Sequence, residues 1–400
     1  MAGALATGAR CAALVGPYLS GKTTLFESIL YATGAIPRKG SVKDGNRVGD
    51  AAPEARERQM SIQISVGTTE YLGDTWHFID CPGSVELAQE ARSALLAADT
   101  AVVVCEPSPE RAMTLAALFK FLDEHDIPHM VFINKMDNAA VPVTAVLEAL
   151  QVAAPRPLVL RQIPIADGDD ITGYVDLVSE RAYKYKPGEA SEIISIPDSL
   201  ADEHSFAREQ MLESLADFDI ELMEKLLEDT IPPTEEIYQQ LTKDLRERLI
   251  VPVFFGSAEN ENGVRRLLKA LRHETPSPDE TAMRYGIDSD GEPIARVFKT
   301  MHAAHTGKLS IARLWRGELE EGANVNGMRI GGLSTLLGNQ QKKLAKAGLG
   351  DVVALSRMDE VSTGDLLTVS GTPPEGVAAW SDPAQPVFSM AIFAVNRADE

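Results

Sequence analysis

The stretch from Gly16 to Thr23 has residue types and a spacing that can hold the phosphates of a nucleotide. It reads Gly-Pro-Tyr-Leu-Ser-Gly-Lys-Thr, the G-x-x-x-x-G-K-[ST] pattern of a phosphate-binding loop. In such a loop the backbone N–H groups surround the β-phosphate, Lys22 reaches the β- and γ-phosphates, and the Thr23 hydroxyl binds Mg²⁺. The predicted nucleotide contacts in this stretch are Gly16, Ser20, Gly21, Lys22, Thr23 and Thr24.

The segments on either side of this loop are predicted to position it. Cys11–Val15 is a short apolar run typical of a buried strand, and Lys22–Thr33 carries Leu25, Ile29 and Leu30 at helical spacing. The alternative is a chance pattern in a flexible loop. Because the motif requires a strand before it and a helix after it, these flanks favour a true phosphate-binding loop.

A second motif, Asn134-Lys135-Met136-Asp137, follows an apolar run that is predicted to be a strand. A carboxylate placed like Asp137 can accept hydrogen bonds from both N1–H and N2–H₂ of guanine, a pair of donors that adenine does not offer. Lys135 is expected to lie along the base, and Asn134 to join this loop to the phosphate-binding loop. A pattern of four residues also arises by accident, but at this place in the chain it indicates GTP rather than ATP.

Two shorter signals complete the set. Asp80-Cys81-Pro82-Gly83 ends a predicted strand. We expect Asp80 to hold Mg²⁺ through water and the Gly83 N–H to contact the γ-phosphate. Gly256-Ser257-Ala258 ends a later strand, and a backbone N–H at Ser257 or Ala258 is expected to reach O6 of guanine.

The composition of the 400 residues, with 44% hydrophobic and 24% charged side chains, is that of a globular protein with room for two or three domains. No apolar run reaches the length of a membrane span, and the N-terminus lacks a secretion-signal pattern. The three scattered cysteines, Cys11, Cys81 and Cys105, argue against a disulfide framework and indicate a cytoplasmic protein. Nothing in the sequence demands more than a monomer.

The formal charge, 38 − 59 = −21, is spread unevenly along the chain. Residues 158–250 hold 9 basic and 22 acidic residues, 9 − 22 = −13, whereas residues 286–372 hold ten of each and are neutral. General binding to DNA is therefore excluded, because it requires clustered positive charge. The acidic segment is either a solvated face or a docking surface for a basic partner, and the sequence alone favours the solvated face.

Alternating strands and helices predict an α/β fold class: a P-loop GTPase domain with a parallel-type sheet and an inserted α+β subdomain, followed by an antiparallel β-barrel. The GTP-binding domain is expected at residues 1–280, with the acidic insertion at 158–250, and the barrel at 281–372. Residues 373–400 are expected to begin a third domain, truncated after a strand at Pro386–Ala394.

Three segments carry more specific expectations. Arg38–Gln59 is predicted to be a long functional or disordered loop, and Ser61–Val66 a strand after it. Asp198–Leu227 reads as helix. The basic run Gln340–Lys346 in the barrel is predicted to be a solvated hairpin, with contact to RNA as the alternative.

With these motifs in this order, the chain resembles a translational GTPase, and more narrowly bacterial elongation factor G or its tetracycline-resistance-like branch. Glu57-Arg58-Gln59-Met60-Ser61-Ile62 is similar to the end of the family's switch I. The resemblance implies GTP or GDP and Mg²⁺ as ligands, with Thr23, Ser61 and Asp80 around the metal. It also implies action on the ribosome, with its rRNA and proteins as partners, and an insertion that faces the ribosomal stalk protein.

The chain departs from the family at the catalytic positions. The switch I Thr of the family is Ser61 here, which keeps a hydroxyl. The His that orients the attacking water corresponds to Ser84, and the phosphate-loop Asp that helps to hold a cation corresponds to Leu19. Tyr18 and Met60 occupy the two positions of the family's hydrophobic gate. Because phosphoryl transfer depends on positioning and charge stabilisation, these changes are expected to lower the hydrolysis rate rather than binding, with Lys22, Gly83 and Ser84 as the catalytic set.

The leading hypothesis from the sequence is a GTP-binding, elongation factor G-like switch that acts on the ribosome, with a weak intrinsic GTPase rate. A second is a GTP-sensing module that binds the ribosome with little or no hydrolysis, which Ser84 and Leu19 favour. A third is a ribosome-protection protein. A fourth, from another class, is a metabolic P-loop enzyme such as a nucleotidyltransferase subunit or a kinase, which the acidic insertion and the long loop at 38–59 disfavour.

Overall fold

The computed structural model describes residues 8–41, 45–50, 52–168, 170–186, 188–303, 307–380, 389–391 and 393–394. Its centre is a sheet in the order β2-β3-β1-β4-β5-β11-β6, in which β2 is antiparallel to β3 and the other neighbours are parallel. The bounds are β1 Arg10–Val15, β2 Ser65–Tyr71, β3 Asp74–Asp80, β4 Thr100–Cys105, β5 His129–Ile133, β6 Leu158–Leu160 and β11 Val251–Phe255.

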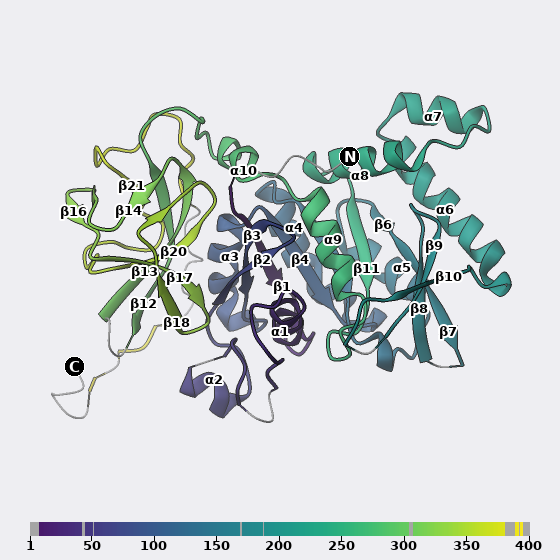
Figure 1. The fold of residues 1–400 in the computed structure, drawn as a ribbon, viewed down its shortest axis with the longest axis horizontal. Helices are drawn as coiled ribbons and strands as arrows, with labels where there is room; N and C mark the ends of the chain where they lie inside the picture. Colours follow the sequence, from purple (N-terminus) through teal and green to yellow (C-terminus); the bar gives the residue numbers. More distant parts are fainter. Residues whose placement is uncertain are drawn as a thin grey trace.

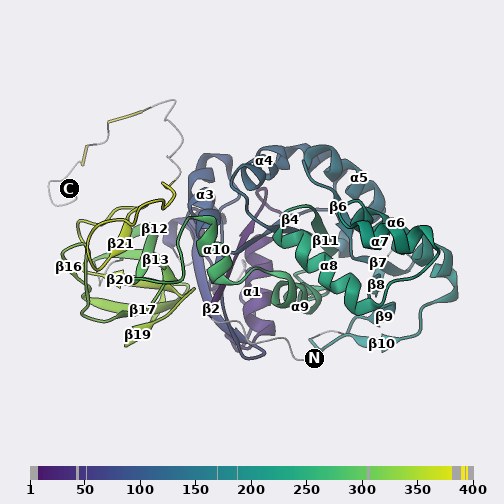
Figure 2. The ribbon, with the colours of Figure 1, turned by 90° about the horizontal axis from the view of Figure 1, so that it is seen from above.

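Helices cover both faces of this sheet (Figures 1 and 2). One apolar core joins α1 (Lys22–Ala32) and α9 (Val264–Glu274) to one face. The other face packs against α3 (Ala88–Ala97), α4 (Ala116–Glu124) and α5 (Val143–Ala153). All six residues of β4 are buried, as expected for a strand that is covered on both sides and therefore reads as a continuous apolar run.

The acidic insertion has a core of its own, at the right of Figure 1. Its antiparallel sheet contains β7 Gln162–Asp167, β8 Asp170–Asp176, β9 Arg181–Lys184 and β10 Glu192–Ile194. Three helices follow, α6 Ala201–Ala216, α7 Ile220–Leu227 and α8 Thr234–Arg246. The predicted helix Asp198–Leu227 is wrong in its middle, because the Asp219 carboxylate accepts the Leu222 N–H at 3.0 Å and so begins a new helix.

Beyond the linker helix α10 (Pro278–Arg284), antiparallel strands form the predicted barrel. The strands are β12 Ile294–Ala303, β13 Gly307–Arg316, β14 Leu319–Glu320, β15 Asn324–Val325, β16 Met328–Arg329, β17 Gly332–Leu337, β18 Gln340–Lys343, β19 Lys346–Ala347, β20 Val352–Ser356 and β21 Leu366–Thr368. Leu337 of β17 pairs with Gly67 of β2, so the barrel continues the edge of the central sheet. The fold class predicted from the sequence is confirmed, and the division into three domains stays a prediction.

Several local predictions need correction. The loop Arg38–Gln59 contains a helix, α2 (Pro53–Arg58), whose Pro at the first position and Arg56 and Arg58 in the last turn are helix signals. The predicted strand Ser61–Val66 starts only at Ser65, because the chain before it turns toward the phosphate-binding loop.

Other predictions hold in part or lie outside the structure. A 3₁₀ helix, Pro109–Leu115, leads directly into α4. Strand β18 is fully exposed, in agreement with a solvated hairpin. Most of the predicted strand Pro386–Ala394 lies outside the described residues. Among the described residues no helix is long and apolar enough to cross a membrane.

Candidate nucleotide-binding site

The four motifs meet at one edge of the central sheet. The phosphate-binding loop follows β1, Asp80 ends β3, Asn134 follows β5 and Gly256 follows β11. These parallel strands all present their carboxyl ends at the same edge, where ligands bind in open α/β sheets. Segments more than 200 residues apart in the sequence are therefore neighbours here.

Two glycines of the phosphate-binding loop are required by its conformation. Gly16 has φ 142° and Gly21 has φ 89°, values that favour glycine. A Cβ at Gly16 would overlap the Val104 carbonyl, and one at Gly21 would overlap the Asn134 amide. The backbone can pass this close to its neighbours, and present its N–H groups to an anion, only without side chains at these positions.

Lys22 lies buried inside the loop. Its ammonium Nζ donates to the Pro17 carbonyl oxygen at 2.9 Å, and burial lowers its pKa, while the nearby Asp80 carboxylate acts in the opposite direction. A Cβ at Gly83 would overlap the same ammonium and the Pro17 backbone. Gly83 thus brings its backbone against the phosphate-binding loop, next to the positive charge that would meet phosphate oxygens.

The three predicted metal ligands converge. The Thr23 hydroxyl donates to Asp80 Oδ2 at 2.7 Å and lies 3.1 Å from the Ser61 hydroxyl. Asp80 is buried, its Oδ1 has no hydrogen-bond partner among the described residues, and burial raises its pKa to about 7. A buried carboxylate with a free oxygen, beside two hydroxyls, offers oxygen ligands to a cation.

This donor set fits Mg²⁺ held jointly with a nucleotide. Magnesium is usually bound through one or two carboxylates, and phosphate and water oxygens supply most of its other ligands. A protein-only metal site is absent from the described part of the chain, where no group of three or more His, Cys, Asp or Glu side chains comes together. Thr23, Ser61 and Asp80 would hold the ion, which when bound would neutralise charge on the phosphates.

Asp50 is a further acidic residue beside this site, and it belongs to no motif recognised in the sequence. It is buried, forms an ion pair with Arg47 at 2.8 Å, and its negative charge contributes to the raised pKa of Asp80. The adjacent Gly49 is so close that a Cβ there would lie 2.9 Å from the Thr23 methyl group. Asp50 therefore adds a second carboxylate near the cation ligands.

Asn134 joins the phosphate-binding loop to the loops around the base. Its Nδ2 donates to the Ser20 carbonyl at 2.9 Å, and its Oδ1 accepts the Ala258 N–H at 2.8 Å. The predicted contact between the two loops is present. The Ser257 N–H donates to the Asn262 carbonyl at 3.0 Å. Both N–H groups expected to reach guanine O6 thus have protein acceptors, and a contact with O6 requires one of them to be shared.

Lys135 and Asp137 differ in how firmly the protein holds them. Lys135 Nζ lies 2.5 Å from Glu106 Oε1, and its backbone has φ 62°. Asp137 is exposed, and its carboxylate accepts a hydrogen bond of 2.8 Å from the neighbouring Asn138 side chain. The carboxylate is therefore accessible to a base that offers two donors.

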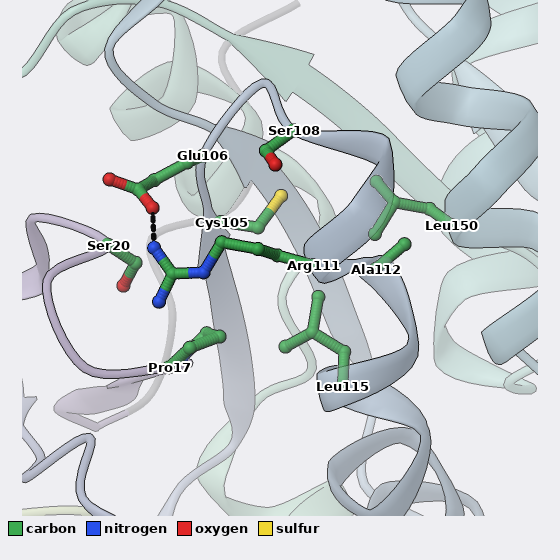
Figure 3. A pocket seen from close by; sticks show the side chains of 9 residues that line it. All are labelled: Pro17, Ser20, Cys105, Glu106, Ser108, Arg111, Ala112, Leu115 and Leu150. Carbon is green, nitrogen blue, oxygen red and sulfur yellow. Dashed lines mark hydrogen bonds and ion pairs between the residues drawn. The ribbon is translucent and has the colours of Figure 1, made fainter.

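A small recess lies between the phosphate-binding loop and the segment after β4 (Figure 3). Glu106 and Arg111 form an ion pair across it, and Arg111 Nη2 also donates to the Tyr18 carbonyl at 3.0 Å. Glu106 therefore links Lys135, in the loop predicted to hold the base, to Arg111, which contacts the phosphate-binding loop. Glu106 and Arg111 belong to none of the motifs recognised in the sequence.

Two of the positions that depart from the expected catalytic pattern, Ser84 and Leu19, make their contacts at the surface. The Ser84 hydroxyl donates to Glu86 in the 3₁₀ turn Val85–Leu87, a local contact at the surface. The side chain of Leu19 is 58% exposed and has φ 67°. Neither side chain contacts Lys22, Thr23 or Asp80 through any described hydrogen bond.

Two protein-family models match separate parts of the chain. Residues 8–277 match the elongation factor Tu GTP binding domain, and residues 293–370 match elongation factor G domain 2. The chain belongs to the elongation factor G-like family of translational GTPases.

Members of this family from several organisms align along nearly all of the chain. An elongation factor G-like protein of Synechocystis is 47% identical over 98% of this chain, and elongation factor G of Thermotoga maritima is 31% identical over 95%. A crystal structure from Thermus thermophilus covers 94% of this chain with a TM-score of 0.83 and 30% identity. The chain spans 58% of the length of these two curated relatives and 57% of that crystallised chain.

Proposed function

We propose that this chain is an elongation factor G-like GTPase that binds GTP, acts on the ribosome and hydrolyses GTP slowly by itself. The observation that carries the proposal is the meeting of Thr23, Ser61 and Asp80, which come from three separate segments. Ser61 belongs to the segment that corresponds to switch I. Its hydroxyl reaches the site only while that segment is folded against the phosphate-binding loop.

The residues of the site divide the work between binding and switching. Lys22 and the loop N–H groups would neutralise and orient the β- and γ-phosphates, and the Gly83 N–H would contact the γ-phosphate. Asp137 would accept from N1–H and N2–H₂ of guanine. Loss of the γ-phosphate would free Gly83 and Ser61, so that the segments around them change order between GTP and GDP states.

The acidic insertion supports a protein partner of opposite charge. Residues 158–250 carry a net charge of −13, and exposed apolar side chains such as Phe206, Leu227 and Ile231 lie on its helices and the loop after α7. Apolar surface within acidic surroundings is typical of an interaction site for a basic partner. We propose the ribosomal stalk protein as that partner, and a cytoplasmic monomer as the working form.

One observation favours a second candidate, a GTP-sensing ribosome-binding module with little or no hydrolysis. The only polar group at the position of the water-orienting His is the Ser84 hydroxyl, and it is engaged by Glu86 at the surface. Without a side chain near the attacking water, a protein can still bind GTP and change shape. Hydrolysis then depends on groups that a partner supplies.

Nucleotide affinity and turnover test these proposals together. We expect GDP and GTP to bind the chain and Asp137→Asn to shift its preference from guanine to xanthine nucleotides, because the amide N–H₂ can donate to the 2-oxo group of xanthine. GTP hydrolysis is then measured with and without ribosomes. Ribosome-stimulated turnover supports the GTPase, tight binding without turnover supports the binding module, and absence of guanine nucleotide binding contradicts both.

A further inference from the structure

A buried carboxylate, Glu27, has no role in the site described above. It lies on α1 four residues after Thr23, so that both side chains lie on the same face of this helix. Its side chain is fully buried. An isolated carboxylate in that position would be costly, so its partners are informative.

Glu27 is satisfied by the backbone of the loop that precedes α2. Its Oε1 accepts the N–H groups of Val48 at 2.5 Å and Gly49 at 3.0 Å, and its Oε2 accepts the Gly40 N–H at 3.1 Å. Burial raises the pKa of Glu27, while these three hydrogen bonds act to lower it. Charge-assisted hydrogen bonds to N–H groups are among the stronger ones, so three of them fix this loop to α1.

The hydrogen bonds that Glu27 accepts from Val48 and Gly49 hold this part of the loop next to the cation ligands. Gly49 is held where a Cβ would lie 3.4 Å from Asp80 Oδ2. The next residue, Asp50, adopts a left-handed backbone with φ 56° and is buried beside that site. A left-handed conformation is uncommon for a residue with a side chain, and it persists where the surroundings impose it.

Two further contacts attach the same loop to the rest of the chain. Lys39 Nζ donates to the Ala258 carbonyl at 3.2 Å and also to the Glu259 carbonyl. On the other side, Val48 packs closely against Gly338 in the turn between β17 and β18 of the barrel. The loop is thus attached to α1, to the loop after β11 and to the barrel.

We propose that Glu27 is a positioning residue, which holds Val48 and Gly49 on α1 so that Asp50 faces the cation site and strengthens Mg²⁺ binding in the nucleotide complex. This inference rests on the proposed function, since it concerns the cation that accompanies GDP or GTP. Glu27 itself touches neither the ion nor the phosphates. It acts through the backbone of the loop.

The test compares Glu27→Ala and Glu27→Gln with the unmodified chain, with Glu54→Ala on the exposed face of α2 as the control. Affinity for N-methylanthraniloyl-GDP is measured in EDTA and over a series of Mg²⁺ concentrations. Mg²⁺ is expected to increase the affinity for the labelled GDP. We expect Glu27→Ala to raise the Mg²⁺ concentration that gives half of this increase about tenfold, the equivalent of about 1.4 kcal/mol. Affinity in EDTA should change less than twofold, and Glu54→Ala should change neither quantity.

The glutamine variant separates positioning from general damage to the fold. Its one carbonyl oxygen can still accept from Val48 and Gly49, whereas its N–H₂ group faces the Gly40 N–H. We therefore expect an effect between those of the unmodified chain and Glu27→Ala. Equal losses of affinity with and without Mg²⁺ would show that Glu27 only stabilises the nucleotide site, and would overturn the proposal.

Hydrogen exchange tests whether Glu27 acts through the backbone of Val48 and Gly49. In the nucleotide-free chain the amides of Val48 and Gly49 should exchange at least tenfold faster in Glu27→Ala, a readout that needs neither metal nor activity. Unchanged exchange would overturn the proposal.

A double variant tests whether Glu27 acts through Asp50. The variant that combines Asp50→Asn with Glu27→Ala should bind N-methylanthraniloyl-GDP in Mg²⁺ no more weakly than Asp50→Asn alone. Additive losses would exclude Asp50 as the intermediary. If the unmodified chain binds no GDP, the proposed function fails while the exchange experiment still tests the loop contacts.

Discussion

Arg313 of the barrel and Asp99 of the central domain form an ion pair of 2.7 Å in which both side chains are fully buried. Asp99 Oδ2 also accepts the Cys11 N–H at 2.7 Å, and Arg313 donates to the carbonyl oxygens of Ala9 and Ala97. Cys11 lies on β1, which leads directly into the phosphate-binding loop. The barrel is therefore attached to the strand that supports the nucleotide site.

We expect Arg313→Met to destabilise the chain strongly. Among the described residues the substitution leaves the buried Asp99 carboxylate with the Cys11 N–H alone as a partner, and breaking a buried pair from one side costs about 3–5 kcal/mol. Urea denaturation measures the change. Glu124→Gln is the matched control, because its pair with Lys120 is exposed and should contribute under about 1 kcal/mol. Equal effects of the two substitutions would contradict a structural role for the buried pair.

His129 should make stability depend on pH in mildly acidic solution. Its ring is buried against Phe119, its Nδ1 faces the Ile127 carbonyl at 2.9 Å, and burial lowers its pKa from 6.5 to about 4. Between pH 6.5 and about 4, His129 therefore binds a proton in the unfolded chain but stays neutral in the folded chain. Stability contributed by neutral His129 is complete above pH 6.5 and falls toward pH 4, by roughly 3 kcal/mol in total.

Substituting this histidine isolates its share of the acid sensitivity. His129→Leu should have a smaller loss of stability between pH 6.5 and 4 than the unmodified chain, measured by denaturation at several pH values. The difference between the two curves matters, because buried carboxylates titrate in both proteins. Parallel curves over this interval would show that the His129 pKa is not lowered in the folded state.

The sequence predicted the parts of the site that belong to local patterns. The spacing from Gly16 to Thr23 and the order of the later motifs were sufficient to place four loops at one edge of a sheet, because parallel strands present their ends together. Glu27 and Asp50 could not be predicted in this way. Their importance comes from backbone amides and from a carboxylate that are distant in sequence, and no periodicity records such contacts.

The predictions of local structure were wrong where polar side chains compete with a regular apolar pattern. The helix predicted from Asp198 to Leu227 breaks at Asp219, whose carboxylate caps the next helix. The strand predicted from Ser61 starts only at Ser65, because the Ser61 hydroxyl meets Thr23 instead. In both cases a side chain that hydrogen-bonds backbone or a distant residue overrode the apolar spacing.

Arg111 should slow the release of nucleotide. It donates to the Tyr18 carbonyl in the phosphate-binding loop and pairs with Glu106, which also holds Lys135. We expect Arg111→Ala to accelerate dissociation of N-methylanthraniloyl-GDP by about threefold to fivefold, since partly exposed ion pairs contribute up to about 1 kcal/mol. Stopped-flow displacement measures the rate. Arg156→Ala is a control of equal exposure, because Arg156 pairs with Asp123 far from the loop. An unchanged rate in Arg111→Ala would show that the loop keeps its shape without this contact.

Ser84→His should raise the rate of GTP hydrolysis. The serine hydroxyl is directed to Glu86 at the surface, and the resemblance to elongation factor G predicts that the family's water-orienting histidine corresponds to this position. A positioned acid–base group contributes about 10²–10⁴-fold, and a partly aligned imidazole should give at least about tenfold under ribosome stimulation. Phosphate release at saturating GTP measures the rate, and GDP affinity should stay within about twofold. Ser84→Ala is the control and should leave hydrolysis unchanged, because among the described residues the hydroxyl donates to Glu86 alone. A gain in Ser84→Ala, or no gain in Ser84→His, would show that another group governs the water, and would assign Ser84 to the turn alone.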